Sequence, residues 1–463
     1  MELNIIYTKG GRTLPDLRSF LKELEQTRDI IKIKDPVSIR FEAAAIMKGF
    51  DCGPAIFFEK IKESDTPIVA NICGTRARIC RSLGVGGDGL YQKIMDSPMH
   101  PLRPVVVKDC PVKEVVEEPK LTKMPILSHY EKDAGPYITS AAVSARSPDG
   151  KIENVSIHRL LVLDDNHLAI RIVPRHLYKL YQMSKKCGKP LDVAIAIGLH
   201  PTVSLAAALQ APFGVSEYDL ANTLQNGGLK LTKCEHVNAY APADAEIVLE
   251  GRISEEDEAV EGPFTDLLGV YDIERKQPIV EVVGVMRRNR YIYQALLPAG
   301  SEHMLLMGLG REVKIWDAVR NVTPFVKGVN LTPGGCGWLH AVISIEKQNE
   351  GDGKNALMAA FAAHTSLKHA VVVDTDIDVF NPYEVEWAIA TRFHGDEDLL
   401  VIRNVRGSSM DPASDQEHEL ITKIGVDATR PLYKSSKNFE RARVLENKNV
   451  KRILKKNARK LVS

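Results

Sequence analysis

A strand-rich stretch between residues 138 and 286 constrains the fold of this chain more than any other feature of its sequence. Short runs of Val, Ile, Leu and Ala recur there, each about the length of a β-strand. The predicted strands cover residues 138–145, 155–163, 168–172, 192–197, 246–253 and 279–286. One helix at 176–186, entered through Pro174, interrupts them. This pattern predicts an antiparallel barrel or sandwich-like domain in the middle of the chain.

Helices and strands alternate in the two flanking parts. Before the strand-rich stretch, a helix at 16–27 with one apolar face precedes strands at 30–33 and 68–71. After it come a helix at 354–366, a strand at 369–373, a helix capped by Asn381 and a strand at 399–402. This order predicts an α/β domain with a parallel sheet. The glycine-rich residues 84–89 lack the Lys-Ser or Lys-Thr pair of a phosphate loop, so they are expected to form a turn.

The length of 463 residues is too great for one ordinary core. We therefore predict a mixed α/β, multidomain fold, and the changes in pattern divide the chain at 1–115, 116–300 and 301–463. The basic tail at 439–460 carries regularly spaced apolar residues. It predicts an amphipathic helix that docks on a partner subunit, and a nucleic-acid-binding tail is the alternative.

Charge and cysteine content exclude several classes of protein. Lys and Arg number 61 against 60 Asp and Glu, so nothing attracts the whole chain to nucleic acid or an acidic membrane, and any anion binding must be local. The 7 cysteines form no C-x-x-C pair, which argues against a disulfide framework and a thiolate zinc site. With no long apolar run and no signal-like start, a cytoplasmic protein is expected.

The segment Asn154-Val155-Ser156-Ile157-His158-Arg159 concentrates reactive side chains between two predicted strands. An amide, a hydroxyl, an imidazole and a guanidinium lie along it, and the basic segment 171–176 follows. Alternating polar residues are typical of a solvated strand face. The additional positive charge favours the floor of an anion site. Both interpretations are open on this segment alone.

Asn154, His176 and Glu217 offer ligands for one divalent ion. An amide oxygen, an imidazole nitrogen and a carboxylate oxygen suit Mn²⁺ or Mg²⁺ better than a metal that prefers thiolates. The three residues are far apart in the sequence, and Glu217 ends the loop-like run Gly214-Val215-Ser216. A solvent-facing Glu217 is therefore the alternative.

Glu261 and Asp266 flank a Gly-Pro turn and can point into one cavity. If Arg159 lies there too, the three form an acid, a base and a cation, as proton transfer requires. The alternative is an acidic surface loop that continues the run Glu255-Glu256-Asp257-Glu258.

Together these motifs resemble the UbiD family of reversible decarboxylases. The matching blocks come in the family's order and span most of the chain. They are residues 154–159, Pro174-Arg175-His176, Gly214-Val215-Ser216-Glu217, residues 245–251, Glu261-Gly262-Pro263-Phe264 with Asp266, Asp376-Ile377-Asp378-Val379 and residues 387–392. The resemblance implies an α/β N-terminal domain, a split β-barrel that binds flavin and an α/β C-terminal domain with a terminal dimerisation helix.

The resemblance also implies a cofactor and the residues that hold it. Family members bind prenylated FMN, with its phosphate held through Mn²⁺ and often a nearby K⁺. By motif, the Mn²⁺ ligands correspond to Asn154, His176 and Glu217. The positions that correspond to the cofactor cradle are Ser156, Ile157, His158, Arg159, Arg175 and His176, with Lys423 reaching in from the last domain. A separate flavin prenyltransferase supplies this cofactor, and a homodimer or larger homo-oligomer is expected.

The family's catalytic set falls on Glu261, Arg159 and Asp266. In the family the cofactor bonds to an unsaturated acid, CO₂ leaves, and the acid residue, here Asp266, protonates the carbon. This sequence departs from the family in two ways: some members carry Glu in place of Asp266, and not all members have the polar or cationic character that His158 and Arg175 add.

The substrate is open between two classes of acid. The segment 170–177 and the compact length resemble the archaeal branch that converts trans-anhydromevalonate 5-phosphate to isopentenyl phosphate and CO₂ in a modified mevalonate pathway. The alternative is an aromatic acid of the 4-hydroxybenzoate or polyprenyl-4-hydroxybenzoate type. Spare Arg, Lys or His side chains in the pocket favour the phosphate, and a flat apolar slot favours the ring. A non-catalytic flavin-binding protein is a remote third alternative.

Overall fold

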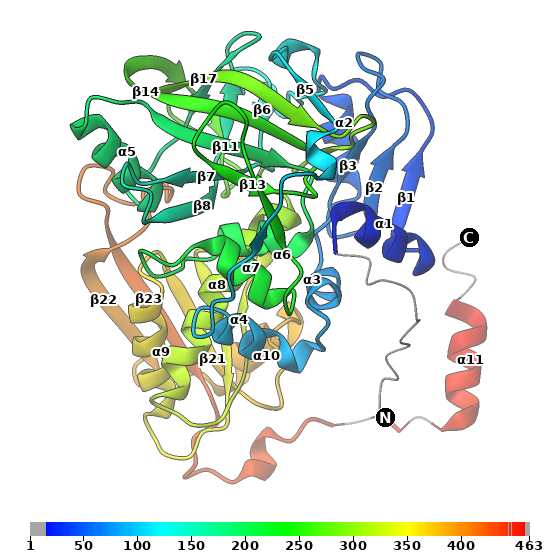
Figure 1. The fold of residues 1–463 in the computed structure, drawn as a ribbon. Coiled ribbons are helices and arrows are strands. Elements are labelled where there is room, and N and C mark those ends of the chain that lie inside the picture. Colours follow the sequence, from blue (N-terminus) through cyan, green and yellow to red (C-terminus); the bar gives the residue numbers. More distant parts are fainter. Residues whose placement is uncertain (1–14, 443, 446, 459–463) are drawn as a thin grey trace.

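An antiparallel sheet occupies the middle of the chain, as predicted (Figure 1). The computed structural model describes residues 15–442, 444–445 and 447–458. The sheet has 9 strands in the order β6-β9-β10-β17-β14-β11-β7-β8, with β5 also paired to β17. Their bounds are β5 Val115–Glu117, β6 Tyr137–Ile138, β7 Ala142–Arg146, β8 Glu153–Ile157, β9 Leu160–Val162, β10 His167–Ile170, β11 Leu191–Ile197, β14 Ile247–Glu261 and β17 Arg275–Arg287. All of these pairings are antiparallel.

Two predicted strands are interrupted. The predicted strand 138–145 divides into β6 and β7, and 155–163 divides into β8 and β9 at His158 and Arg159. Residues outside a strand are released from the regular alternation of side chains between the two faces of a sheet. The second interruption places Arg159 outside a strand, and its side chain reaches Glu261 at the end of β14.

The two faces of the sheet carry side chains of different size. On β11, Val193, Ile195 and Ile197 pack in the same cluster as helix α5 (His176–Lys186), which matches its predicted bounds. Ala194 and Ala196 alternate with them and pack in the cluster that contains helices α6 (Pro201–Ala208) and α7 (Glu217–Leu224). Small side chains on this face allow the two helices to approach the sheet closely.

The N-terminal part contributes a smaller sheet in the order β1-β2-β3-β18. Its strands are β1 Ile30–Ile33, β2 Ala55–Phe58, β3 Ile68–Ala70 and β18 Tyr293–Ala295. Its helices are α1 Leu17–Gln26, α2 Glu42–Gly49, α3 Arg76–Leu83 and α4 Leu90–Asp96. The predicted helix at 16–27 is confirmed: Asp16 caps α1, and Leu17, Phe20, Leu21 and Leu24 are buried.

Small strands connect the parts of the chain. The strand β18 belongs by sequence to the central part but pairs with β3. Similarly, β4 (Val105–Val106) pairs with β12 (Lys230–Lys233), which pairs with β13 (Tyr240–Pro242). The hairpin β15 (Phe264–Thr265) and β16 (Tyr271–Asp272) extends the central part. The predicted domain boundaries remain a prediction, and these pairings show that the first two parts share sheets.

The C-terminal part holds a mixed sheet in the order β19-β20-β21-β23-β22. The bounds are β19 Val326–Leu331, β20 His340–Ile345, β21 His369–Asp374, β22 Leu399–Arg406 and β23 Leu420–Ala428, with helices α9 Asp352–Ala363 and α10 Pro382–Arg392. The strands β20, β21 and β23 are parallel, but β22 pairs antiparallel with β23. The prediction of a parallel sheet was therefore wrong for 399–402. No helix lies between β22 and β23, and a parallel pair needs a crossover connection.

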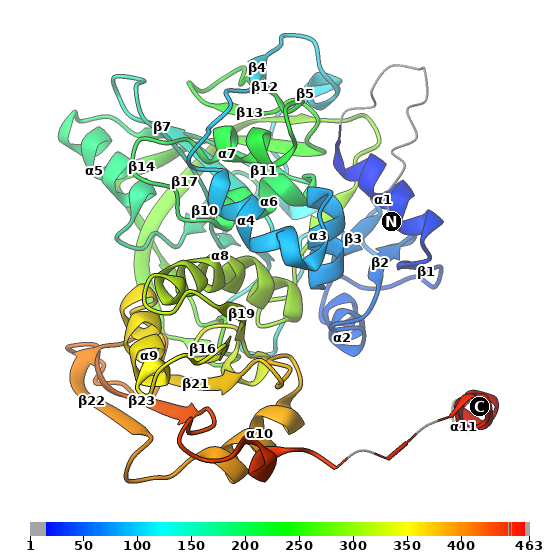
Figure 2. The same ribbon diagram turned by 90° about the horizontal axis from the view of Figure 1, so that it is seen from below.

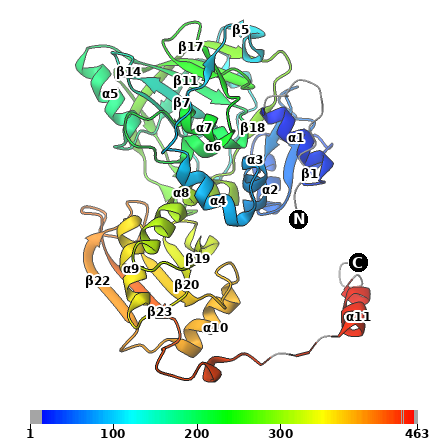
Figure 3. The ribbon, with the colours of Figure 1, turned by 60° about the horizontal axis from the view of Figure 1, so that its bottom comes forward.

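Helix α8 (Ser301–Arg320) lies between the central and C-terminal sheets, as Figures 2 and 3 show from two directions. The predicted tail helix is present as α11 (Lys448–Ala458), which stands apart from the rest of the fold in Figure 3. No helix among the described residues is long and apolar enough to cross a membrane.

Candidate active site

Arg159 binds three carboxylates with one guanidinium. Its Nε and Nη2 donate to Glu261 Oε1 and Oε2, both at 2.8 Å, and its Nη1 donates to Asp266 Oδ2 at 2.8 Å. Nη2 also donates to Asp272 Oδ2 at 2.9 Å. Desolvation alone lowers the pKa of Arg159, but the hydrogen bond and charge of Glu261 and the charges of Asp266 and Asp272 raise it above its usual value. The guanidinium therefore stays positive throughout the working range of an enzyme.

The two predicted catalytic carboxylates differ in access. The Glu261 side chain is 0% exposed, and both of its oxygens are occupied by Arg159, with the Tyr137 hydroxyl donating to Oε1 at 3.0 Å. The Asp266 side chain is 27% exposed. Of these two carboxylates Asp266 is therefore the one open to solvent, which suits its predicted role as the proton donor.

Aromatic side chains hold this set in place. The Phe264 ring lies 4.6 Å from the guanidinium carbon of Arg159, and the Tyr137 and Phe264 ring centres are 4.5 Å apart. The alternative of an acidic surface loop is wrong for Glu261, because β14 continues through the acidic run and ends at this buried residue. The structure brings Arg159, Glu261 and Asp266 together as predicted, and their roles remain predictions.

Asn154 on β8 and Glu217 at the start of α7 are in direct contact. The Asn154 amide donates to both Glu217 oxygens, at 3.1 and 3.2 Å, and the Val155 N–H donates to Oε2 at 2.6 Å. Glu217 is 3% exposed, so the solvent-facing alternative is wrong. Burial raises the pKa of Glu217 to about 8, although the hydrogen bonds from Val155 and Asn154 oppose the shift. A cation beside this carboxylate would favour its ionised form.

The neighbouring hydroxyl bears on whether Asn154 could be a metal ligand. The single hydroxyl proton of Ser156 has two acceptors in reach, Asn154 Oδ1 at 3.1 Å and His158 Nε2 at 2.9 Å. His158 Nδ1 must donate to the Arg171 carbonyl at 2.9 Å, and desolvation lowers the pKa of His158 to about 4, so the ring is neutral and Nε2 accepts. The Asn154 oxygen is then left without this proton. With Glu217 it offers the hard oxygen ligands that Mn²⁺ or Mg²⁺ prefers.

His176 does not contact this pair. Its ring packs edge-on against Phe213 at 5.2 Å, and no hydrogen bond among the described residues joins it to Asn154 or Glu217. Desolvation and the charges of Lys179 and Arg175 lower the pKa of His176, which favours the neutral ring that a metal ligand needs. Across the described ranges no three His, Cys, Asp or Glu side chains form a metal site. A site here depends on the Asn154 amide, and the role of His176 remains a prediction.

Four basic side chains gather between α5 and α8, and we call them the cation cluster: Arg175, Lys179, Arg311 and Lys314. Lys314 Nζ donates to Gln210 Oε1 at 3.2 Å, and Arg311 lies 5.2 Å from the Trp338 ring. Desolvation, with repulsion from Arg175, lowers the pKa of Arg311 to about 10. Of the four, only Arg175 was predicted as a site residue.

Lys423 lies on β23 with its ammonium held inside the C-terminal part. Nζ donates to the carbonyls of Thr365 at 2.6 Å and Leu367 at 2.5 Å. Desolvation lowers the pKa of Lys423 to about 8. The structure does not bring it into contact with the other predicted site residues, and its reach to the cofactor remains a prediction.

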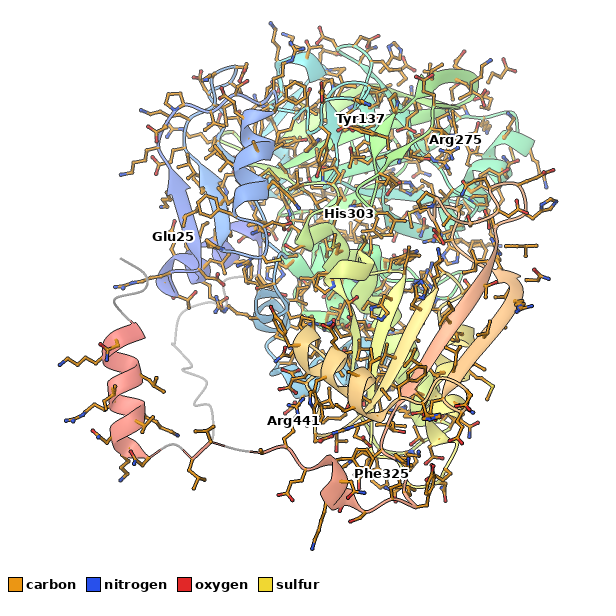
Figure 4. The ribbon with its side chains drawn as sticks, turned by 180° about the vertical axis from the view of Figure 1, so that it is seen from behind. Glu25, Tyr137, Arg275, His303, Phe325 and Arg441 are labelled. Atoms are coloured by element: carbon orange, nitrogen blue, oxygen red, sulfur yellow. The ribbon has the colours of Figure 1, made fainter. Side chains whose placement is uncertain are left out.

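Sequence reasoning missed His303, in the first turn of α8. Figure 4 shows His303 where α8 meets the central part. The Ala299 N–H donates to its Nδ1 at 3.2 Å, which leaves the ring proton on Nε2. Desolvation lowers the pKa of His303, and the charges of Asp266 and Arg159 act on it in opposite directions. An N–H donor therefore lies near Asp266 and Arg159, two residues of the predicted catalytic set. The sequence signal that could have found this helix start is Gly300 followed by Ser301 and the acidic Glu302.

Comparison with known proteins agrees with the geometry. Three domain families match: the 3-octaprenyl-4-hydroxybenzoate carboxy-lyase N-terminal domain over residues 21–97, its Rift-related domain over 104–301 and its C-terminal domain over 304–428. The anhydromevalonate phosphate decarboxylase of Methanothermobacter thermautotrophicus is 44% identical over 432 residues, covering 92% of this chain and 99% of that protein.

Two solved structures share the fold. The UbiD-class enzyme HmfF from Pelotomaculum thermopropionicum in complex with FMN is 40% identical, with a TM-score of 0.91, covering 93% of this chain and 97% of that one. An evolved dimeric form of HmfF in complex with prenylated FMN is 39% identical, with a TM-score of 0.87 and the same coverage of 93% and 97%. These matches confirm the predicted mixed α/β fold and the prediction of a carboxy-lyase. The chain belongs to the UbiD family of decarboxylases.

Proposed function

We propose that this enzyme uses prenylated FMN to decarboxylate trans-anhydromevalonate 5-phosphate, giving isopentenyl phosphate and CO₂. The observation that carries the proposal is the carboxylate arrangement at Arg159, with a closed Glu261 and an accessible Asp266 on one guanidinium. The relative named for anhydromevalonate phosphate decarboxylation matches this chain at 44% identity over nearly its whole length. The HmfF structures contain FMN or prenylated FMN.

The departure of CO₂ leaves a negative charge on carbon that no amino-acid side chain can delocalise. Prenylated FMN, when bound, supplies the electron sink for this charge. Asn154 and Glu217, with His176, would hold Mn²⁺ against its phosphate, and a nearby K⁺ would complete the site. The side chains that would line the cradle are Ser156, Ile157, His158, Arg159 and Arg175, with Lys423 at its far side.

The protein positions the substrate and moves a proton. Glu261 holds Arg159 through two hydrogen bonds and keeps its guanidinium plane fixed. Arg159 orients the substrate carboxylate, and Asp266, held by one N–H of Arg159, delivers a proton to the carbon that CO₂ leaves. The Nε2–H of His303 offers a further donor beside Asp266.

The cation cluster favours the phosphorylated acid over the aromatic one. Spare positive side chains are expected where a substrate phosphate binds, whereas an aromatic acid needs an apolar slot. We further propose that a flavin prenyltransferase supplies the cofactor, that the enzyme works in the cytoplasm, and that α11 joins it into a homodimer or larger homo-oligomer.

The direct test is CO₂ release by protein reconstituted with prenylated FMN, Mn²⁺ and K⁺. trans-Anhydromevalonate 5-phosphate and 4-hydroxybenzoate are compared side by side. We expect turnover of the phosphate alone. Turnover of the aromatic acid alone would replace the proposed substrate, and turnover of neither would count against both.

A further inference from the structure

The hairpin that carries Asp266 needs support from outside itself. Its strands β15 and β16 have 2 residues each and, among the described residues, pair only with each other. An isolated two-stranded hairpin is at best marginally stable in water. Asp266 begins the turn between the two strands, where its N–H donates to the Val270 carbonyl at 3.1 Å. The position of its carboxylate therefore depends on what holds β15.

The segment 130–137 lies beside residues 261–265 and forms hydrogen bonds with them. The Ala134 N–H donates to the Pro263 carbonyl at 2.9 Å. The Tyr137 hydroxyl accepts from the N–H of the preceding glycine at 3.2 Å. Both contacts lie before β15 begins, so the hairpin itself is held by a third contact.

Asp133 supplies this third contact. Its Oδ1 accepts from the Thr265 N–H at 2.8 Å and from the Thr265 hydroxyl at 3.1 Å. Its Oδ2 accepts from the Tyr130 N–H at 3.1 Å, which fixes the carboxylate within its own turn. Thr265 is 3% exposed and immediately precedes Asp266. Among the described residues, Asp133 is the only side chain that forms a hydrogen bond with Thr265.

We propose that Asp133 is a positioning residue for the proton donor: through Thr265 it sets where the Asp266 carboxylate stands relative to Arg159. This inference rests on the proposed role of Asp266 as the acid. Arg159 holds the Asp266 side chain, and Asp133 holds the backbone just before it. Without Asp133, β15 can shift while the hydrogen bonds between Arg159 and Glu261 stay in place. A shift of about 1 Å in a reacting group can lower the rate by about 10²-fold.

The first test removes both hydrogen bonds to Thr265 with Asp133→Ala in the reconstituted holoenzyme. The kcat for trans-anhydromevalonate 5-phosphate should fall by about 10²-fold, while KM and flavin content stay within about 2-fold of wild type, because Arg159 is unchanged. Asp133→Asn keeps an acceptor oxygen and should recover part of the loss. Asp165→Ala is the matched control, because Asp165 Oδ1 also accepts from the N–H and the hydroxyl of a threonine, Thr122, and it should behave as wild type.

The same change in the Asp266→Asn background separates positioning from any other role. If Asp133 acts only by placing the acid, Asp133→Ala should cause no further loss of turnover once the acid is removed. A further loss of about 10²-fold in that background would overturn the proposal, because Asp133 would then act on Arg159 or on the fold. An unchanged kcat in Asp133→Ala alone would also overturn it. Should Asp133→Ala not fold, Thr265→Val removes the hydroxyl contact alone and should show the same pattern with a smaller loss.

Hydrogen–deuterium exchange makes the test independent of the reaction. Peptides that cover residues 264–272 should exchange about 10-fold faster in Asp133→Ala than in wild type, because the Thr265 N–H loses its acceptor, and Asp165→Ala should match wild type. If the wild-type holoenzyme releases no CO₂ from the phosphorylated acid, the proposed function fails, and faster exchange would still support the hold of Asp133 on the hairpin. Wild-type exchange in Asp133→Ala would overturn it whatever the substrate.

Discussion

At the scale of single residues, three carboxylates share Arg159 unequally. Glu261 takes two of its hydrogen bonds in a fork, and Asp266 and Asp272 take one each. Asp272 has a second partner, because Arg275 Nη1 donates to its Oδ1 at 2.5 Å. Asp266 has a second hydrogen bond as well, from the Leu267 N–H to Oδ1 at 2.7 Å, but Arg159 is the one cation that holds it among the described residues.

Replacing Glu217 tests its proposed role as a Mn²⁺ ligand. In Glu217→Ala the buried carboxylate is lost, so Mn²⁺ and flavin should both be absent after reconstitution and desalting, while the wild type keeps both. Elemental analysis and flavin absorbance measure the two. Asp219→Ala, in the same first turn of α7, is the matched control and should retain both. If Glu217→Ala retained metal and flavin, the assignment would be wrong.

Site residues that occur in a sequence motif could be predicted. Residues that reach the site only through the folding of distant segments could not. Asn154, Arg159, Glu261 and Asp266 stand in recognisable blocks, and the structure places each in a polar cluster. Asp272 reaches Arg159 only because β16 folds back on β15. Tyr137 reaches Glu261 from 124 residues away. Neither contact leaves a local pattern in the sequence.

At the scale of elements, α8 is held by a buried network as well as by apolar packing. Glu312 accepts from the Leu331 N–H at 2.8 Å and the Tyr91 hydroxyl at 3.1 Å, and it forms an ion pair with Arg76. These partners come from β19, α4 and α3. The network therefore ties α8 to the N-terminal and C-terminal parts at once.

Removing the cationic partner of the Arg76–Glu312 ion pair should destabilise the fold. Arg76→Met leaves Glu312 as an unpaired buried charge, so we expect the free energy of unfolding to fall by about 3–5 kcal/mol. The double variant Arg76→Met with Glu312→Leu should lose less unfolding free energy than the two single variants lose together. Urea denaturation of the four proteins measures the coupling. A single-variant cost below about 1 kcal/mol would show that the pair does not hold α8.

Helices with a capping residue and one apolar face could be predicted from the sequence, whereas the almost fully buried helix α6 could not. Helix α10 starts at Pro382 behind its Asn381 cap, as expected. Nearly every residue of α6 is buried, so it has no polar face to reveal its period. Helix α8 contains Gly308, which disfavours a helix in isolation. The fold requires it, because a Cβ there would lie 2.6 Å from the Gly337 carbonyl oxygen.

At the scale of the whole molecule, three buried histidines make the fold sensitive to acid. Desolvation lowers the pKa of His129 to about 3, of His200 to about 4 and of His364 to about 3. As the pH falls, each of these imidazoles binds a proton near pH 6.5 in the unfolded chain but only at a lower pH in the folded chain. Their contribution is therefore present above pH 6.5, and stability is lost as pH falls below it, by about 1.4 kcal/mol per pH unit for each imidazole.

Urea denaturation between pH 7 and pH 5 measures this slope. His129→Leu should make it shallower by about 1.4 kcal/mol per pH unit, because one proton fewer binds on unfolding. His100→Leu, at an exposed histidine, is the control for the loss of an imidazole as such. An unchanged slope in His129→Leu would mean that this imidazole titrates alike in the folded and unfolded chains.

In the proposed reaction, Asp266 is the acid of a decarboxylase organised by Arg159. The most direct measurement is CO₂ release from trans-anhydromevalonate 5-phosphate by Asp266→Asn, with flavin and Mn²⁺ content matched to wild type. An amide preserves the size of the side chain but cannot deliver the proton, so turnover should fall by about 10²–10⁴-fold while the cofactor remains bound. Turnover within about 2-fold of a wild type that is active on this substrate would show that Asp266 is not the acid, since general acid catalysis contributes far more than that.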